Sequence, residues 1–148
     1  MKRKFEPCIL SVIMLAALAS LALASCEKGL EESDVPYAAP LVDNVLSGIE
    51  GRDYATFSRD FSDAMKDAIG AEGFPSVVAK MDDALGKYES RNFLGATKAR
   101  AKGKDYVIVK YAAIFEKEDK AKITIYIGDA DGKKQIEGFM ALPHGGMK

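Results

Sequence analysis

The stretch at 106–115 reads YVIVKYAAIF and is apolar at nearly every position. A short apolar run rich in β-branched and aromatic residues is typical of a strand that is covered on both faces. Farther along, 122–127 alternates between apolar and polar residues, and a turn at 128–132 leads to a last strand at 135–142. With another strand or bent pair of strands at 88–104, the second half of the chain is predicted to form about four strands joined by short turns.

Upstream of these strands, apolar residues recur at helical spacing in three segments. The segments cover 41–49, 53–70 and 75–86. Aspartate is a favourable N-cap at the start of the second segment, and Gly86 is expected to end the third. Helices grouped before an antiparallel meander predict an α+β fold, with three N-terminal helices packed on a mostly antiparallel four-stranded sheet.

The first 26 residues have the layout of a secretory signal peptide. A basic segment at 2–4 precedes a stretch of apolar and small residues at 9–24, and the segment closes on Ser25 and Cys26. The sequence LASC at 23–26 resembles the lipobox of prokaryotic lipoproteins. This resemblance implies that the chain is cut between Ser25 and Cys26 and that the Cys26 thiol becomes acylated.

This layout predicts a signal peptide at 1–25, a tether at 26–34 that starts from lipidated Cys26, and a folded domain at 35–148. The alternatives are an uncut transmembrane anchor and a plain secretory signal. The apolar run is short for an anchor, because spanning a bilayer takes roughly 20 apolar residues. As a lipoprotein or an anchored protein, the domain lies outside the cytoplasm and is attached to the cell membrane or the outer membrane.

Charge and cysteine content exclude several classes of function. The 148 residues carry a formal net charge of -1, which gives no general attraction to nucleic acid. The single histidine, His144, rules out a His-rich metal site. Cys8 leaves with the predicted signal peptide and Cys26 is blocked by lipid, which excludes a cysteine nucleophile and a thiolate metal site. The sequence predicts no metal and no cofactor.

Two charged segments each have alternative interpretations. The segment DADG at 129–132 favours a hairpin turn over a calcium loop, because an EF-hand needs its glycine at the sixth position. Four cations alternate with uncharged residues and would lie on one face of a strand: Lys98, Arg100, Lys102 and Lys104. They are either solvated residues that protect a sheet edge or a contact for anionic lipid headgroups or another polyanion.

The segments at 49–57, 60–62 and 85–88 read IEGRDYATF, DFS and LGKY. In this order they resemble the nuclear transport factor 2-like superfamily, and most closely its small prokaryotic lipoproteins of unknown function. The resemblance covers about residues 35–143 and implies a curved sheet crossed by a helix, forming a cone that often encloses a pocket. Some members of the superfamily are isomerases or dehydratases with an Asp or His base inside the cone, and many pair through the sheet.

The large side chains of the second helical segment and the strands either fill such a cone as core or line an apolar pocket: Tyr54, Phe57, Phe61, Met65, Tyr111, Phe115, Tyr126 and Phe139. No residue is predicted to be catalytic. The leading prediction is a membrane-anchored, non-catalytic domain that binds a small apolar ligand or a protein partner. The alternative is an isomerase- or dehydratase-like enzyme with a buried carboxylate beside a tyrosine of the cone, and a homodimer is compatible with either.

Overall fold

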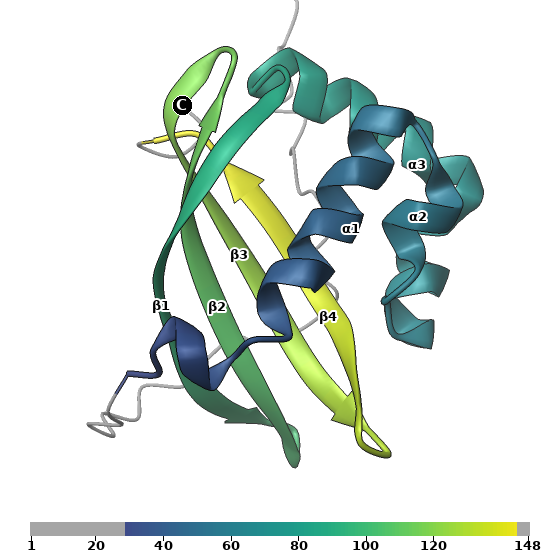
Figure 1. The fold of residues 1–148 in the computed structure, drawn as a ribbon. Helices are drawn as coiled ribbons and strands as arrows, with labels where there is room; N and C mark the ends of the chain where they lie inside the picture. Colours follow the sequence, from purple (N-terminus) through teal and green to yellow (C-terminus); the bar gives the residue numbers. More distant parts are fainter. Residues whose placement is uncertain (1–28, 145–148) are drawn as a thin grey trace, which may run out of the picture.

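The computed structural model of the chain describes residues 29–144, so the predicted signal peptide and Cys26 lie outside the described residues. These residues form a short 3₁₀ helix, three α-helices and a four-stranded sheet, which confirms the α+β class (Figure 1). In chain order the elements are η1 (Glu32–Asp34), α1 (Ala38–Gly51), α2 (Tyr54–Ser58), α3 (Asp63–Ala84), β1 (Tyr88–Ala101), β2 (Lys104–Phe115), β3 (Glu118–Ala130) and β4 (Lys133–Leu142).

The sheet is an open antiparallel meander in which the strands lie in sequence order. Two of its hairpins have two-residue turns that begin at Lys102 and Asp131, with φ of 49° and 54°. Positive φ at both turn residues matches the right-handed twist of the flanking strands, as in a type I′ turn. The hairpin at Asp131 confirms the turn predicted at 129–132. The turn at Lys102 divides the four basic residues between two strands, so the prediction that they share one strand face is wrong.

Side chains of β2 alternate between the two faces of the sheet. Val109, Tyr111 and Phe115 are buried against the helices, whereas Lys110 and Ile114 on the opposite face are exposed. The described helices all lie on one side of the sheet (Figure 1). The prediction that helices or other elements cover both faces of 106–115 is therefore wrong for the described residues, and the apolar run belongs to a strand with one packed face.

The predicted helix at 53–70 is two helices with a break at 59–62. Within the break, Phe61 forms a parallel bridge with Ile136 of β4, and Ile136 N donates to Asp60 O at 2.7 Å. The Ser62 hydroxyl then accepts a hydrogen bond from Met65 N and caps α3. The buried residues Phe57, Phe61 and Met65 keep helical spacing across the break, although Phe61 reaches the core from a bridge with β4 and not from a helix. The prediction of one continuous helix is wrong for this reason.

Helix α3 is itself two helical segments, because Gly70 has non-helical φ and ψ of 58° and 165°. The predicted helix starting at Pro75 is part of the second segment, which begins a turn earlier than the sequence indicated. The end of α3 is as predicted. Gly86 has φ of 76° and its N–H donates to Met81 O and Asp82 O, which is a left-handed glycine closing a helix.

Helices α1 and α2 approach each other closely at Gly48. A Cβ atom at this position would lie 2.3 Å from Phe57 N and 2.5 Å from Phe57 Cα. The turn between the helices is equally tight, since Arg52 adopts a left-handed conformation with φ of 53° and Asp53 N donates to Gly48 O at 2.8 Å. A glycine in the interior of α1 therefore lets the backbone of α2 contact α1 directly.

Each edge of the sheet carries one isolated bridge. On β1, Leu30 N donates to Ala96 O at 2.7 Å, and Ala96 N donates back to Leu30 O at 3.3 Å. On β4 the bridge is the one between Phe61 and Ile136. Residues 30–34, assigned to the tether by the sequence, thus contact the domain, and the buried Val35 follows them into the core.

Candidate functional site

Six of the eight predicted pocket residues are buried in the hydrophobic core that joins the helices to the sheet: Phe57, Phe61, Met65, Tyr111, Phe115 and Phe139. Two of the rings pack directly on each other, with the centroids of Phe57 and Phe61 4.8 Å apart in an edge-to-face arrangement. Tyr54 is half-buried beside this core, and its ring centroid lies 5.7 Å from that of Phe74. These side chains contribute their area to packing within the chain.

Tyr126 does not join the others. It lies on β3 between the buried residues Ile125 and Ile127, so its side chain occupies the opposite face of the sheet. There it covers Gly138 of β4, where a Cβ atom would lie 3.1 Å from the tyrosine ring. An aromatic ring over a cross-strand glycine stabilises a sheet, and this is the role that the structure gives Tyr126.

A surface cleft of about 400 Å³ lies where α1 and α3 end beside the β2–β3 hairpin. Its apolar lining includes Ile49, Met81 and Phe115, while charged side chains form much of the rest. The full lining consists of Leu46, Ile49, Glu50, Arg52, Met81, Asp82, Gly86, Lys87, Tyr88, Phe115, Glu116 and Lys117. Of the predicted pocket residues only Phe115 is among them.

Hydrogen bonds from the β2–β3 hairpin hold the walls of this cleft together. Lys117 Nζ donates to Asp82 O at 2.8 Å, which places a cation at the C-terminal end of α3. The backbone N–H of Lys117 donates to Leu85 O at 2.9 Å. Gly86 is required here, because a Cβ atom would lie 3.0 Å from Glu116 Cβ in addition to its positive φ.

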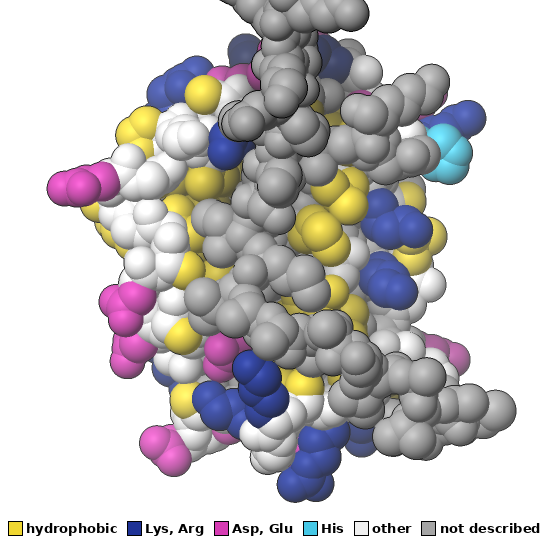
Figure 2. Space-filling view, turned by 180° about the vertical axis from the view of Figure 1, so that it is seen from behind, with side chains coloured by type: hydrophobic (Ala, Val, Ile, Leu, Met, Phe, Trp, Pro, Cys, Tyr) yellow, Lys and Arg dark blue, Asp and Glu magenta, His cyan; other side chains and the backbone are white. Residues whose placement is uncertain are grey.

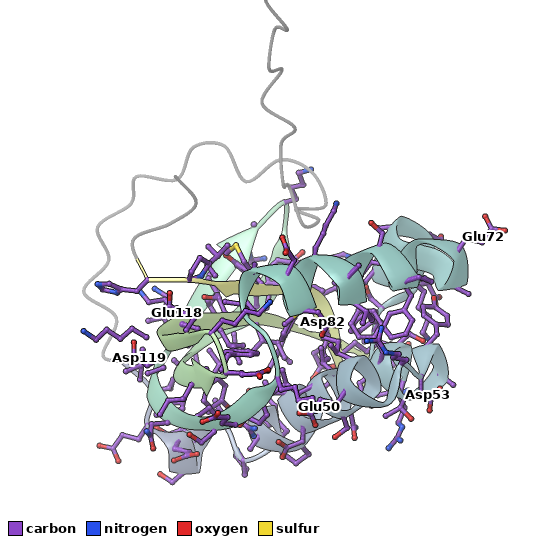
Figure 3. All side chains as sticks on the ribbon, turned by 90° about the horizontal axis from the view of Figure 1, so that it is seen from above. Glu50, Asp53, Glu72, Asp82, Glu118 and Asp119 are labelled. Atoms are coloured by element: carbon purple, nitrogen blue, oxygen red, sulfur yellow. The ribbon has the colours of Figure 1, made fainter. Side chains whose placement is uncertain are left out.

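An ion pair links the two helices at the rim of the cleft. Arg52 Nη2 lies 2.9 Å from Asp82 Oδ2, and both side chains are substantially exposed. Figure 3 shows Glu50 and Asp82 on α1 and α3, in contrast to Glu72, which follows the Gly70 kink of α3 and points away from the molecule. The cleft therefore combines an apolar floor with a rim of exposed acidic and basic side chains. This combination suits an apolar group with a polar end.

A second cleft, of about 430 Å³, lies at the start of α3 beside the opposite ends of the strands. Most of its lining is charged or polar, with Asp63, Lys104, Asp105 and Asp129 among the residues. An apolar group would gain less from this cleft than from the first, because it would cover polar groups that water otherwise solvates.

Arg91 joins α1 to the sheet below the aromatic core. Its Nη1 donates to Asp43 Oδ1 and, at 3.1 Å, to the Tyr88 hydroxyl, and its guanidinium carbon lies 5.2 Å from the centroid of the Tyr111 ring. Burial lowers the pKa of Arg91, but the hydrogen bonds to Asp43 and Tyr88 outweigh this effect and raise it above its usual value. Burial raises the pKa of Tyr111. Near neutral pH, Arg91 therefore stays positively charged and Tyr111 stays neutral, and the contact between them does not change with pH.

The remaining pKa shifts belong to structural hydrogen bonds. The Thr56 hydroxyl donates to Asp53 at 2.6 Å and lowers the pKa of this N-cap carboxyl below 3.8. In the β3–β4 hairpin, Lys134 Nζ lies 2.8 Å from Asp129 Oδ2, which lowers the pKa of Asp129 and raises that of Lys134. Both oxygens of Asp129 are engaged within the hairpin, since Gly132 N donates to its Oδ1 at 2.7 Å.

The enzyme alternative requires a carboxylate beside a tyrosine inside the concave face. Within residues 29–144, every Asp and Glu side chain is exposed or half-buried, and the buried polar residues are Ser58, Ser62 and Thr124. No group of three or more His, Cys, Asp or Glu in these residues could hold a metal ion. In the same part of the chain, no helix has the length and hydropathy needed to cross a membrane.

Comparison with known proteins gives one match. The family model described as "Protein of unknown function (DUF4019)" matches residues 42–139. The matched segment extends from the first turns of α1 almost to the end of β4 and so includes all of the core except Val35, Ala38 and Leu41. No match was found among curated proteins or among solved structures.

Proposed function

Because the chain belongs to the DUF4019 family, a family described as of unknown function, we propose its function from its own residues. The protein is a lipoprotein, anchored through Cys26 in the cell membrane or the outer membrane, with its domain outside the cytoplasm. The domain is a non-catalytic binding module. It takes an apolar group, from a small ligand or from a protein partner, in the cleft between α1, α3 and the β2–β3 hairpin.

The observation that carries the binding role is the composition of this cleft. Its volume of about 400 Å³ falls in the range of small-molecule sites, roughly 300–1,000 Å³. Ile49, Met81 and Phe115 are each at most 7% exposed, so the small apolar surface that they offer is already fixed by the core and binding costs little ordering of these side chains. The described carboxylates supply no buried general base, and therefore the enzyme alternative is not proposed.

The proposal includes assignment of the domain to the nuclear transport factor 2-like superfamily. Support comes from the order of the elements, in which three helices precede a four-stranded antiparallel meander and pack on one of its faces. The segment 49–57, which carries the resemblance in the sequence, forms the end of α1, the tight turn and the start of α2. In the superfamily a short helix ends in a Gly-Asp-Tyr-like turn that precedes a second helix, and this segment has the same order.

Mutation of Cys26 to alanine is expected to abolish lipid attachment and processing. Intact mass spectrometry of membrane-extracted protein should give a wild-type mass that matches a chain starting at Cys26 plus a diacylglycerol. Ser25→Ala is the matched control, because it keeps a small residue before the cut and should be processed like the wild type. An unprocessed full-length mass in all three proteins would instead mean a permanent N-terminal anchor, and the lipoprotein assignment would be withdrawn.

Blocking the cleft is expected to weaken binding of an apolar probe at least fivefold. We would titrate the domain with N-phenyl-1-naphthylamine, a neutral dye whose fluorescence rises in apolar sites. Glu50→Trp places a large ring over the apolar floor from the rim of α1, whereas Ser47→Trp places it on an exposed position of the same helix outside the cleft. Equal affinity in both variants would move the site elsewhere, and a wild type without saturable binding would exclude the small-ligand form.

A further inference from the structure

Charge is divided unevenly between the two layers of the domain. Residues 31–84, which form the helical layer, contain four Lys or Arg and twelve Asp or Glu. Residues 85–144, which form the sheet, contain twelve Lys or Arg and eight Asp or Glu. The near-zero net charge of the chain therefore conceals an acidic helical layer and a basic sheet, and the two layers respond oppositely to a charged surface.

The basic residues of the sheet are most concentrated in the β1–β2 hairpin. Its four cations, all exposed, are Lys98 and Arg100 on β1, Lys102 in the turn and Lys104 at the start of β2. Arg100 Nε lies 3.6 Å from Asp105 Oδ1, and both of these side chains are more than two-thirds exposed. No described carboxylate forms an ion pair with the three lysines. We call these four residues the basic hairpin.

The basic hairpin lies at one end of the sheet. Lys133 and Lys134 follow the β3–β4 turn at the same end, and dark-blue side chains gather at this lower end in Figure 2. The cleft lies at the opposite end of β2, since its lining includes Phe115 and Glu116. A strand of 12 residues rises about 3.3 Å per residue, so the basic hairpin and the cleft are separated by roughly 35–40 Å.

The start of the domain is fixed to β1 beside this hairpin. Leu30 pairs with Ala96, and the bridge is antiparallel. Moving from Leu30 toward the N-terminus therefore means moving along β1 toward Lys98 and Arg100. In Figure 1 the first described residues lie at the end of the sheet that carries the β1–β2 hairpin.

Cys26 stands four positions before Leu30 in the chain. An extended chain spans at most about 3.3–3.6 Å per residue, so these four steps reach at most about 14 Å. The four steps from Ala96 to Arg100 cover a similar length of β1. A lipid on Cys26 therefore leaves the basic hairpin within reach of the membrane surface, where charges closer than a Debye length of about 8–10 Å are poorly screened.

We propose that the basic hairpin is a membrane-docking surface that binds the anionic headgroups of the bilayer in which the Cys26 lipid is inserted. This proposal rests on the proposed function, because the lipid on Cys26 supplies the proximity. Docking through Lys98, Arg100, Lys102 and Lys104 brings this end of the sheet to the anionic surface and holds the cleft at the far end of β2, away from the bilayer. Each cation near an anionic surface strengthens the contact about fivefold.

The test uses the full-length, processed and lipidated protein in vesicles of phosphatidylcholine with or without phosphatidylglycerol. A processed chain has no cysteine besides the acylated Cys26, so one introduced cysteine is a unique site for a fluorophore. Thr97→Cys places the fluorophore on β1 beside the basic hairpin, and Ser76→Cys places it on an exposed position of α3. Quenching by a spin-labelled phospholipid reports which of the two positions is near the bilayer.

We expect strong quenching at position 97 and weak quenching at position 76 in vesicles that contain phosphatidylglycerol. The triple variant Lys98→Glu, Lys102→Glu and Lys104→Glu should reduce quenching at position 97 at least fivefold. The matched control reverses three exposed lysines elsewhere on the sheet, Lys110, Lys120 and Lys122, and should retain the quenching. Circular dichroism of each variant verifies that it is folded.

Failure of this proposal is distinguishable from failure of the proposed function. A chain whose mass contains the acyl group and which floats with the vesicles, but is quenched equally at both positions, would overturn the docking surface and leave the anchor intact. A chain without an acyl group would remove the anchor itself. Quenching at position 97 that is unaffected by phosphatidylglycerol or by the triple reversal would overturn lipid docking. If the fluorophore at position 97 is shielded from water in native membranes but is not quenched in vesicles, lipid docking would be overturned in favour of an acidic protein partner.

Discussion

Replacement of Gly48 by alanine is expected to destabilise the domain by at least about 2 kcal/mol. The new Cβ atom would lie 2.3 Å from Phe57 N and 2.5 Å from Phe57 Cα, both backbone atoms of α2. A backbone contact cannot be relieved by a change of rotamer, so α1 and α2 must move apart and open the core between them. This cost exceeds the gain of about 1 kcal/mol that alanine gives over glycine in a helix interior.

Gly51→Ala is the matched control for this prediction. Gly51 lies in the last turn of the same helix, and a Cβ atom there would meet nothing within 4 Å. The same change should therefore stabilise the domain by up to about 1 kcal/mol, because only the helix propensity acts. Urea unfolding followed by circular dichroism measures both effects as shifts of the midpoint. Shifts of the same sign in the two variants would contradict the close approach of α1 and α2.

Truncation of Phe57 to alanine is expected to cost about 3–5 kcal/mol, a large part of the stability of a single domain. Helix α2 has only five residues and is too short to be stable by itself, so its position depends on the packing of this ring. Phe57 is 1% exposed, and its ring centroid lies 4.8 Å from that of Phe61 and 4.7 Å from that of Phe74. Removing the ring leaves a cavity lined by two other aromatic side chains.

Leu94→Ala removes a large apolar side chain that is 56% exposed and should change the unfolding free energy by less than about 0.5 kcal/mol. If Phe57→Ala had an equally small effect, the aromatic core of α2 and α3 would have to be assigned differently. Because Phe57 also supplies the backbone that contacts Gly48, the two large effects should not add. The double variant is expected to lose less stability than the sum of the single variants.

The sequence predicted the type and order of the elements better than their limits. Helix α1 and strands β2, β3 and β4 follow from helical spacing, apolar runs or alternation in the sequence. Strand β1, in which only Ala96 is buried, was predicted only as a strand or a bent pair. The break between α2 and α3 was missed because Phe57, Phe61 and Met65 keep helical spacing across it. Ser62, a strong N-cap residue, was the local indication that a new helix begins at this point. It could not be recognised from sequence alone, because the break also depends on the bridge between Phe61 and the distant Ile136.

The candidate site was less predictable than the fold. Periodicity selects the residues that are buried, and Phe57, Phe61 and Tyr111 are buried because they fill the core. The cleft is formed where the ends of α1 and α3 meet the β2–β3 hairpin. This juxtaposition depends on tertiary contacts between residues 30 or more positions apart, such as Arg52 and Lys117 with Asp82. The local signal was Gly86, which the sequence identified only as the end of a helix.

The two isolated bridges have a consequence for proteins that share a membrane. Copies of this chain anchored as proposed would diffuse in a single plane with similar orientation, and this would raise the effective concentration at which their sheet edges meet. A long unpaired edge is a template for adding strands from another copy and for growth into a polymer. Here Leu30 forms a backbone bridge with Ala96 on β1, and Phe61 forms one with Ile136 on β4. Each edge is interrupted near its middle, so crowding in the plane does not offer a second copy a continuous row of free backbone groups.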